Sequence, residues 1–318
     1  MTQDGSIHRA CPGQDIISEI PDMIRLHILT LLPRKYAVRT GVLSTKWKDL
    51  WKHRFPHPTT LTFGRATETD EDQNQLAKEI QVNMTKHGKK KIETYNLYFY
   101  PGKNHEQMAS EWVEQAVTNG AEEFHLDFSQ DGMGHYPSKQ IARRAKKIEL
   151  KESLFKCNKA LTTLSLTYCR MQRYFKFKHF SCLETLCLNQ VNINDFMFEK
   201  LVSNCKGLEK LELWQCLHLK HIQIGGNKLD RLKKLTIAYC CRTKHIHISA
   251  PMLQTFYFYG KFPVSFVMFY NMPFLSDVIL VSPSKYVYQF RYMDIKALVF
   301  VWLDQVQVLT LSSGSLQV

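Results

Sequence analysis

The sequence predicts an α/β protein in which a short all-helical module precedes a right-handed solenoid with a concave parallel sheet. Two observations predict this architecture: an N-terminal helical stretch with more apolar residues than it can bury, and a short apolar pattern that recurs through the rest of the chain. The length of 318 residues and the apolar content of 44% suit one large or two modest domains. We divide the chain into a disordered N-terminus (1–14), the helical module (15–54), a connector with a helix (55–91) and the solenoid (92–318).

Two prolines bound the first helix of the helical module. Pro21 is expected at the first helical position, where its fixed φ is favourable, and Pro33 ends the helix about a dozen residues later. An apolar stripe at helical spacing lies between them, formed by Ile24, Ile28, Leu31 and Leu32.

A second apolar face follows in the same module. Ser44 is expected to cap a helix on which Trp47, Leu50 and Trp51 share one face. A module of roughly 40 residues cannot bury two apolar faces by itself. An uncovered apolar face usually marks a binding site, so we expect the module to dock on another protein.

From about residue 92 the chain repeats one pattern: apolar, two residues, apolar, one residue, apolar. The clear copies are Leu161-Leu164-Leu166, Leu183-Leu186-Leu188, Leu208-Leu211-Leu213, Leu232-Leu235-Ile237 and Leu253-Phe256-Phe258. Weaker copies are Ile92-Tyr95-Leu97, Ala121-Phe124-Leu126, Leu275-Val278-Leu280 and Val306-Leu309-Leu311. The clear copies begin roughly 20–29 residues apart, which is the period of leucine-rich repeats. Cys169, Cys216 and Cys240 each stand three residues after a copy, in the slot where such repeats use Asn or Cys to satisfy backbone groups at a turn.

Side chains alternate along each strand of such a solenoid, so the residues between the leucines face outward on the concave side. Three large aromatic residues are among them, and aromatics are enriched at binding hot spots. We expect a binding surface there, formed by Lys210, Glu212, Trp214, Lys234, Tyr257 and Tyr259. The alternative is that a neighbouring loop covers the aromatic side chains.

The remaining segments are assigned by periodicity and capping residues. Helices are expected over 73–87, over 104–118 with Asn104 as N-cap, and over 195–205 with Asn194 as N-cap. Strands are expected over 92–100 and 122–128, which makes the Thr-rich, acidic stretch 56–72 a connector.

The helical module resembles the F-box of plant F-box/leucine-rich-repeat proteins of the FBD type, and the later layout is similar to theirs over nearly the whole chain. The matching runs are Ile20-Pro21-Asp22, Ile28-Leu29, Leu31-Leu32-Pro33, Ala37-Val38-Arg39-Thr40, Val42-Leu43-Ser44, Lys46-Trp47 and Leu50-Trp51. The sequence departs from the pattern at Ile20, where leucine is commoner, and at Gly41, where serine or cysteine is usual. Many members carry a further C-terminal FBD domain, which this chain is expected to lack because it ends at Val318.

The resemblance implies the substrate receptor of an SCF-type cullin–RING ubiquitin ligase. Its F-box would dock on an SKP-family adaptor, and through it on cullin, while the solenoid would hold a target protein. The adaptor contact and its local support would come from Ile20, Pro21, Ile24, Ile28, Leu32, Val38, Leu43, Trp47, Leu50 and Trp51. Such a receptor needs no catalytic residue and no cofactor.

A ligase-independent binding module is the alternative function. The net charge of +13, with basic clusters at 86–91 and 143–147, would let the solenoid hold nucleic acid or an acidic protein. The resemblance does not call for nucleic acid, whose binding would depend strongly on salt.

Enzymatic motifs and a metal site are not expected. Cys216, His218, His221, Cys240, Cys241, His245 and His247 are the strongest metal candidates, but they lack a Cys-x-x-Cys pair. No apolar run suits a secretory signal or a membrane span, so we expect a protein of the nucleus or cytoplasm with reduced cysteines. The apolar stretch 297–303 before the last copy is expected to form an unstable end.

Overall fold

The computed structural model describes residues 16–32, 34–54, 59–65, 67, 69–102, 104–130, 147–155, 160–178, 180–225, 229–261, 265–268, 272–281 and 306–311. The chain divides into two compact units, Met1–Thr59 and Thr60–Val318, which we call the helical unit and the solenoid unit. The expectations for residues 1–14, 143–146 and 297–303 lie outside the described residues.

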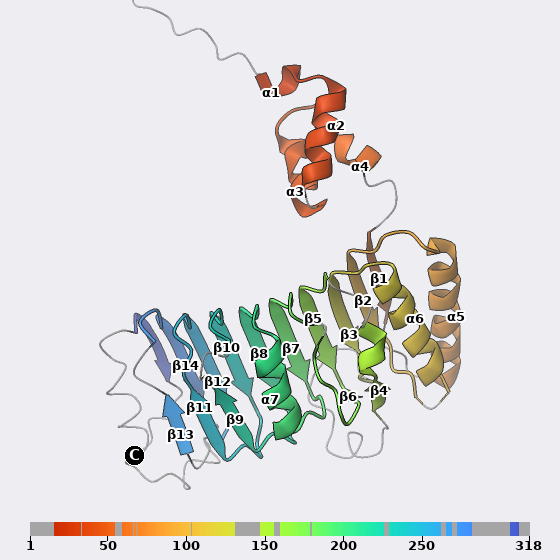
Figure 1. Cartoon of the computed structure of the whole chain (residues 1–318). Helices are drawn as coiled ribbons and strands as arrows, with labels where there is room; N and C mark the ends of the chain where they lie inside the picture. The colour runs from red at the N-terminus through yellow and green to blue at the C-terminus, as the bar shows by residue number, and fades with distance from the viewer. Residues whose placement is uncertain are drawn as a thin grey trace, which may run out of the picture. The chain divides into compact units, whose positions relative to one another are not determined.

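The helical unit contains four short α-helices and a 3-10 turn (Figure 1). They are α1 (Ile16–Glu19), α2 (Asp22–Leu31), α3 (Arg34–Arg39), η1 (Thr40–Val42) and α4 (Leu50–Arg54). Pro21 directly precedes α2 rather than opening it, and its carbonyl accepts the N–H groups of Ile24 and Arg25, both at 3.0 Å. Proline suits this place because its extended backbone leaves the carbonyl free to start the helix.

Ser44 does not cap a helix, contrary to the expectation from its sequence position. Turns occupy 45–49, and the helix begins only at Leu50. Trp47 lies in these turns, where its indole N–H donates to the carbonyl of Ile17 at 3.0 Å. This tertiary contact, together with burial of the indole, prevails over local helix propensity.

The core of the helical unit is small. It consists of Leu29, Ala37 and Trp47. Ile28, Leu32, Leu50 and Trp51 pack against it. Leu29, which lies off the predicted stripe, is fully buried, whereas Leu31 on the stripe is exposed.

The solenoid unit is built on a ten-stranded sheet in which all neighbours are parallel. Its strands, in spatial order, are β1 (Thr60–Gly64), β2 (Thr94–Tyr98), β3 (Glu123–Asp127), β5 (Thr163–Thr167), β7 (Thr185–Asn189), β8 (Lys210–Trp214), β10 (Lys234–Ala238), β12 (Thr255–Tyr259), β14 (Asp277–Val281) and β15 (Val308–Leu311). The spatial order follows the chain order, as stacked repeats require.

The sheet begins earlier than the sequence predicted. The expected connector contains β1, which pairs with β2 from Thr60↔Thr94 to Gly64↔Tyr98. Leu61 is buried and Phe63 packs against the core, while β-branched threonines alternate with them. This period of two, with β-branched residues, favours a strand over a loop.

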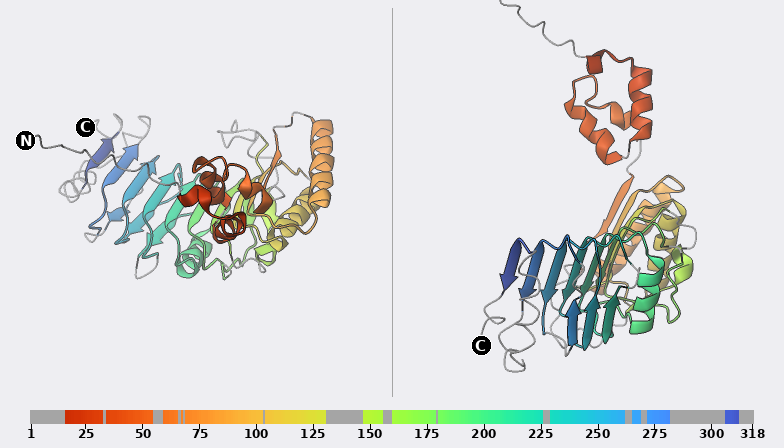
Figure 2. Two further views of the ribbon diagram at one scale, coloured as in Figure 1. Left: turned by 90° about the horizontal axis from the view of Figure 1, so that it is seen from above. Right: turned by 60° about the vertical axis from the view of Figure 1, so that its left-hand side comes forward.

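A second layer covers one face of the main sheet, on the viewer's side in Figure 1 (Figures 1 and 2). It contains α5 (Asp70–His87), α6 (Glu106–Thr118), η2 (Glu152–Phe155) and α7 (Asp195–Asn204). It also contains the sheet of β9 (His221–Ile224), β11 (His245–Ile248) and β13 (Ser265–Met268), and the pair β4 (Ile148–Leu150) and β6 (Cys169–Met171). The helices therefore back the early and middle repeats, and short strands back the later ones.

The helix starts show where capping residues can be read from sequence. Asn194 caps α7 as predicted, because its Oδ1 accepts the N–H of Met197 at 2.9 Å. Asn104 does not cap α6, which begins one residue later with His105 as its N-cap. Thr69 caps α5 and accepts the N–H of Asp72 at 3.1 Å, so this helix starts three residues before the predicted Gln73.

Inward side chains of the main sheet form one continuous core with the second layer. The cysteine slots are confirmed: the Sγ of Cys216 donates to the carbonyl of Leu188 at 3.5 Å, and that of Cys240 to the carbonyl of Leu213 at 3.7 Å. Cys169 is also fully buried, and burial raises its pKa to about 12. The thiols of Cys216 and Cys240 therefore satisfy backbone carbonyls near the ends of the strands in the preceding repeats.

Replacing Leu211 by alanine should lower the free energy of unfolding by roughly 2–5 kcal/mol, because the side chain is fully buried on a central strand. Leu217→Ala is the matched control: Leu217 is 43% exposed, so its loss should change stability by less than about 0.5 kcal/mol. Urea denaturation followed by circular dichroism measures both. Equal effects of the two substitutions would contradict the assignment of Leu211 to the core and of Leu217 to the surface.

Candidate functional site

The surface of the helical unit carries exposed apolar side chains. Ile24 is 52% exposed, Leu43 is 46% exposed and Val42 is 87% exposed. Val38 and Pro21 are exposed as well. Because the core of this unit is closed without them, these residues are free to contact another protein.

The predicted adaptor-binding set divides into three groups in the structure. Pro21, Ile24, Val38 and Leu43 are exposed. Ile20, Ile28, Leu32, Leu50 and Trp51 are half-buried. Trp47 is only 2% exposed and belongs to the core.

The predicted adaptor-binding set leaves out other exposed apolar residues of the helical unit, namely Ile17, Met23, Leu31, Tyr36 and Val42. Their only signal is that they are apolar in a module with a small core. Helical periodicity places residues on a face, but it does not say which face meets the core.

The second surface is the open face of the main sheet, formed by the first, third and fifth side chains of each strand. Strand register aligns these side chains in rows. One row crosses the sheet through Asn189, Trp214, Ala238, Tyr259 and Val281. All six predicted binding residues lie on this face, on the consecutive strands β8, β10 and β12.

Aromatic rings stack across the open face. Trp214 and Tyr259 lie two strands apart, with ring centroids at 6.0 Å and an interplanar angle of 19°. They meet because the intervening residue is Ala238, whose side chain is too small to separate them. Tyr239 adds a further ring, 6.4 Å from Tyr259. The cluster is half-buried and forms a preorganised apolar platform.

Charged and polar groups fix the side chains around this platform. Lys210 and Glu212 form an ion pair at 2.9 Å. The Nζ of Lys234 lies over the ring of Tyr257, 5.0 Å from its centroid. The hydroxyl of Tyr257 donates to the Oδ2 of Asp277 at 2.7 Å. Because that hydrogen bond stabilises the phenol, and burial and the carboxylate charge add to it, the pKa of Tyr257 is raised.

Tyr239 and Asp277 belong to this surface and were missed in the sequence. Tyr239 follows β10 and has a φ of 54°, which turns its ring toward Tyr259. Asp277 opens β14, a copy that is weak by its apolar pattern. Only their positions within the repeat could have indicated that these two residues join the open face, and those positions become meaningful only once the strand register is known.

The histidine and cysteine candidates for a metal do not converge. Within the described ranges, no group of three or more His, Cys, Asp or Glu side chains is placed to hold a metal ion. His221 and His245 instead stack with centroids at 5.0 Å, and Nδ1 of His221 hydrogen-bonds Oδ2 of Asp195 at 2.8 Å.

Asp277→Asn should lower the pKa of Tyr257 toward its usual value, because the substitution removes the negative charge that opposes the phenolate. Titration of ¹³C-ring-labelled tyrosines, with Tyr257→Phe to assign the signal, measures this pKa. Glu212→Gln serves as the control and should leave it unchanged. An unaltered Tyr257 titration in Asp277→Asn would refute the role of the carboxylate.

Two protein-family models match the chain. The model described as the leucine-rich-repeat domain of At1g61320/AtMIF1 matches residues 83–315. The F-box domain model matches residues 17–57. Together the two matches cover the helical unit and most of the solenoid unit, and domains of these two kinds indicate a protein-interaction adaptor.

Similar proteins come from Arabidopsis thaliana. The putative F-box/LRR-repeat protein At5g02930 is 27% identical over 246 residues, which cover 76% of this chain and 45% of the relative. The F-box/FBD/LRR-repeat protein At1g13570 is 27% identical over 277 residues, covering 86% of this chain and 55% of the relative.

The chain thus spans about half the length of the curated relatives it matches. Among the described residues, no helix is both long and apolar enough to span a bilayer. The helical unit, the parallel repeats and the family matches agree, and the chain belongs to the plant F-box/leucine-rich-repeat proteins.

Proposed function

We propose that this protein is the substrate-recognition subunit of an SCF-type cullin–RING ubiquitin ligase. The observation that carries the proposal is the apolar surface of the F-box unit, which stays exposed after the unit's own core is closed. That surface would dock on an SKP-family adaptor, and through it on cullin. The solenoid unit would hold the target.

The F-box surface suits an adaptor contact because the residues that hold the unit together are different from those exposed on its surface. Trp47 and Leu29 hold the short helices together from inside. Ile24, Val38 and Leu43 remain available outside. Interface energy concentrates in a few apolar anchors, and these residues would supply them.

The open face of the solenoid supports target binding. Trp214 and Tyr259 offer a stacked apolar platform, and Lys210, Glu212 and Lys234 surround it with oriented charges. Apolar centres with polar rims are typical of protein interfaces.

The proposed mechanism needs no chemistry from this chain. Holding a target on the solenoid while the F-box holds the ligase raises the effective concentration of target lysines near the charged ubiquitin-conjugating enzyme. The protein would act in the nucleus or cytoplasm, where a fluorescent fusion would locate it.

The double substitution Ile24→Asp and Leu43→Asp should reduce recovery of a co-expressed SKP-family adaptor by roughly tenfold or more, because charges would replace apolar anchors. Val82→Asp with Met252→Asp is the matched control, since both are exposed apolar residues of the solenoid unit. Quantitative co-purification measures the effect. Full recovery of adaptor with a folded Ile24/Leu43 variant would argue against the docking surface and favour a ligase-independent binding module.

The double substitution Trp214→Ala and Tyr259→Ala should remove target proteins from proximity-labelling profiles by roughly tenfold while adaptor recovery stays unchanged. Phe196→Ala with Tyr174→Ala is the control, because it removes two exposed aromatic rings that lie outside the open face. Identical profiles for wild type and the Trp214/Tyr259 variant would place target binding elsewhere.

A further inference from the structure

The two edges of the main sheet differ in how their charges are balanced. At the edge where the strands begin, Lys91 pairs with Glu122 at 3.1 Å. Arg231 and Lys233 both pair with Glu209, at 2.9 and 2.8 Å. The cations of these pairs are neutralised by carboxylates of neighbouring repeats.

The opposite edge carries cations at equivalent places in successive repeats. His218 and Arg242 each stand two residues after a turn cysteine, and Lys220 and Lys244 each stand four residues after it. The backbone brings these turns together, since the N–H of Lys244 donates to the carbonyl of Lys220 at 2.8 Å. Neighbouring strands are about 4.8 Å apart, so the basic side chains of successive repeats form a closely spaced row.

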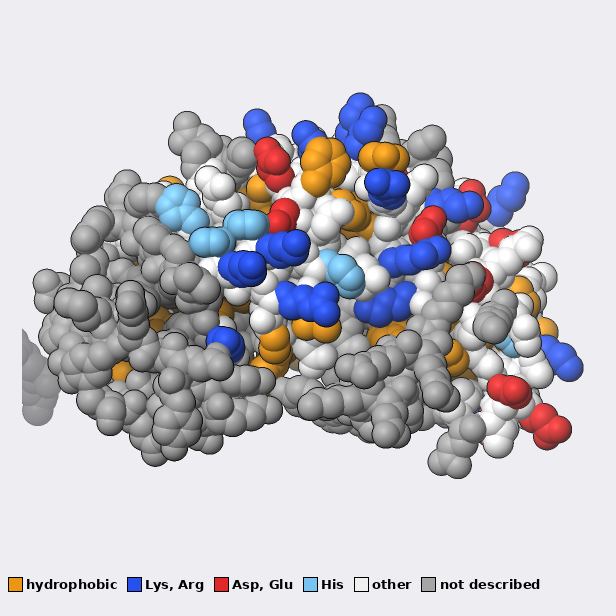
Figure 3. Space-filling model, turned by 90° about the horizontal axis from the view of Figure 1, so that it is seen from below, with side chains coloured by type: hydrophobic (Ala, Val, Ile, Leu, Met, Phe, Trp, Pro, Cys, Tyr) orange, Lys and Arg blue, Asp and Glu red, His pale blue; other side chains and the backbone are white. Residues whose placement is uncertain are grey.

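Figure 3 shows this edge from below, with Lys, Arg and His side chains gathered across its middle and few acidic side chains among them. Among the described residues, Lys220, Arg242 and Lys244 form no ion pair with a carboxylate. Within the part of the chain that the structure describes, no carboxylate therefore pairs with these three cations.

Lys147 adds a half-buried cation to the same edge. Its Nζ donates to the carbonyl of Gln190 and to Oδ1 of Asn192, and it lies 4.9 Å from the ring centroid of Tyr168. These partners are neutral or aromatic, so they orient the ammonium without cancelling its charge. Burial lowers the pKa of Lys147.

His218 is an imidazole that lies close to two of these cations, and its neutral form is favoured there. Its pKa is lowered by partial burial first, and then by the positive charges of Lys147 and Arg242. Mutual repulsion of this kind is relieved when an anion binds between the groups.

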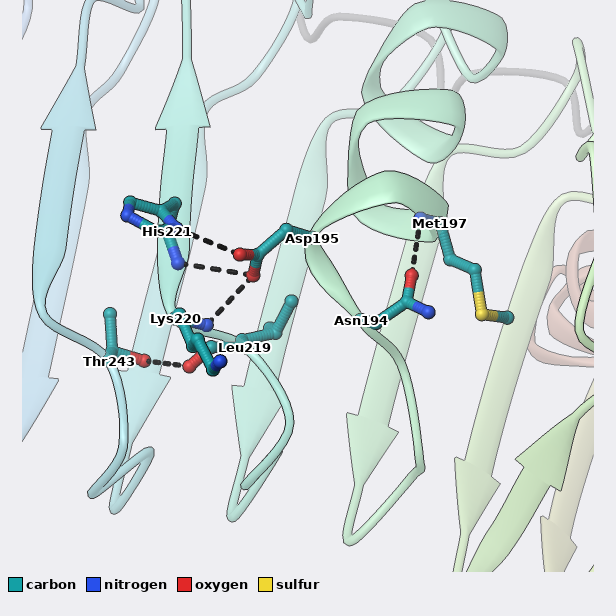
Figure 4. A network of polar contacts seen from close by, with 7 residues as sticks. All are labelled: Asn194, Asp195, Met197, Leu219, Lys220, His221 and Thr243. Carbon is teal, nitrogen blue, oxygen red and sulfur yellow. Dashed lines mark hydrogen bonds and ion pairs between the residues drawn. The ribbon is translucent and has the colours of Figure 1, made fainter.

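Nearby carboxylates are already engaged. Asp195 accepts the backbone N–H of Lys220 at 2.8 Å, the backbone N–H of His221 at 3.1 Å and the ring of His221 (Figure 4). Burial would raise the pKa of Asp195, but these hydrogen bonds outweigh it and the pKa is lowered. Glu149 pairs with Arg170 at 3.0 Å. These two described carboxylates are therefore not paired with Lys220, Arg242 or Lys244, whose side chains stay available to an anionic partner.

We propose that this basic edge, formed by Lys147, His218, Lys220, Arg242 and Lys244, binds an acidic polypeptide segment of the target. The proposal rests on the proposed function as a target receptor. Continuity supports it: Arg242 follows Tyr239 by three residues, and Tyr239 stacks on Tyr259 of the open face. A target anchored on the aromatic platform can place a run of Asp and Glu along this edge.

The surrounding aromatic rings favour carboxylates over nucleic acid. Single-stranded nucleic acid is held by cations together with rings on which bases stack. Here Tyr168 is covered by Lys147, and Tyr239 is stacked on Tyr259. These two rings are therefore already in contact with side chains of this protein and are less available for stacking on bases.

Fluorescence anisotropy with a fluorescein-labelled octaglutamate peptide tests the proposal on the full chain, which is co-expressed with the adaptor and purified through a tag on the chain itself. The triple variant Lys220→Glu, Arg242→Glu and Lys244→Glu should bind the peptide roughly tenfold more weakly than wild type. The control Lys78→Glu, Lys89→Glu and Lys206→Glu makes the same change in net charge at exposed lysines elsewhere and should weaken binding less than about twofold.

Equal weakening by both triples would reduce the effect to net charge and overturn the proposal, as would unchanged binding by the first triple. The neutral triple Lys220→Gln, Arg242→Gln and Lys244→Gln repeats the test if the reversed charges disturb folding. A labelled oligothymidine of equal charge that bound more tightly than the peptide would assign the edge to nucleic acid instead. Adaptor recovery is measured in the same samples, so failure of the docking proposal and failure of the basic edge are told apart.

Discussion

Each repeat of the solenoid depends on its neighbours, because a single repeat cannot bury its own inward leucines. Leu186, Leu211 and Leu235 are aligned on adjacent strands and are fully buried. A shift of one residue would turn the leucines outward, so their burial fixes the register of the whole sheet. The same register sets every outward side chain beside its counterpart in the next repeat. Both the aromatic platform and the basic edge follow from how the leucines are buried.

Several strands are followed by a residue with a left-handed backbone conformation, and this residue extends the register of the strands into the turns. Tyr168, Gln190, Gln215 and Tyr239 have φ values of 57°, 53°, 50° and 54°. Each donates its N–H to the last carbonyl of the next strand, as Gln190 does to Trp214 at 2.8 Å. Such a conformation costs about 1–3 kcal/mol at a non-glycine residue, and the feature that all four turns share is the extra backbone hydrogen bond to the next strand. The turn thereby places Tyr239 beside the aromatic platform. It also places the cations that follow Tyr239 in the sequence at the edge of the sheet.

The sequence predicts those features that depend on local pattern or on strict repetition. The inward leucines, the cysteine slots and the Asn194 cap could all be identified because one residue type at one spacing performs one task. Features that depend on tertiary contacts could not be predicted from the sequence. Trp47 enters the F-box core through turns, and the threonines of β1 resemble a loop until β2 is beside them. Tyr239 and Asp277 join the open face only through the register of distant strands.

The division of the F-box residues was also beyond sequence reasoning. Leu29 and Leu31 are equally apolar and two positions apart, yet one is buried and the other is exposed. A small module has apolar residues on most faces, and only packing selects which of them form the core. The role of the exposed residues in docking stays a prediction.

The change from helices to strands behind the main sheet has a consequence for curvature. Packed helices lie about 8–10 Å apart, whereas strands are about 4.8 Å apart. Repeats that carry α5 and α6 are therefore wider on the side of the helices than on the side of the main sheet, and this difference bends the sheet. Repeats backed by β9, β11 and β13 have equal spacing on both sides, because His221, His245 and Ser265 stay in register. This end of the solenoid is consequently straighter than the end that the helices cover, so the rows of outward side chains on β8, β10 and β12 run nearly parallel.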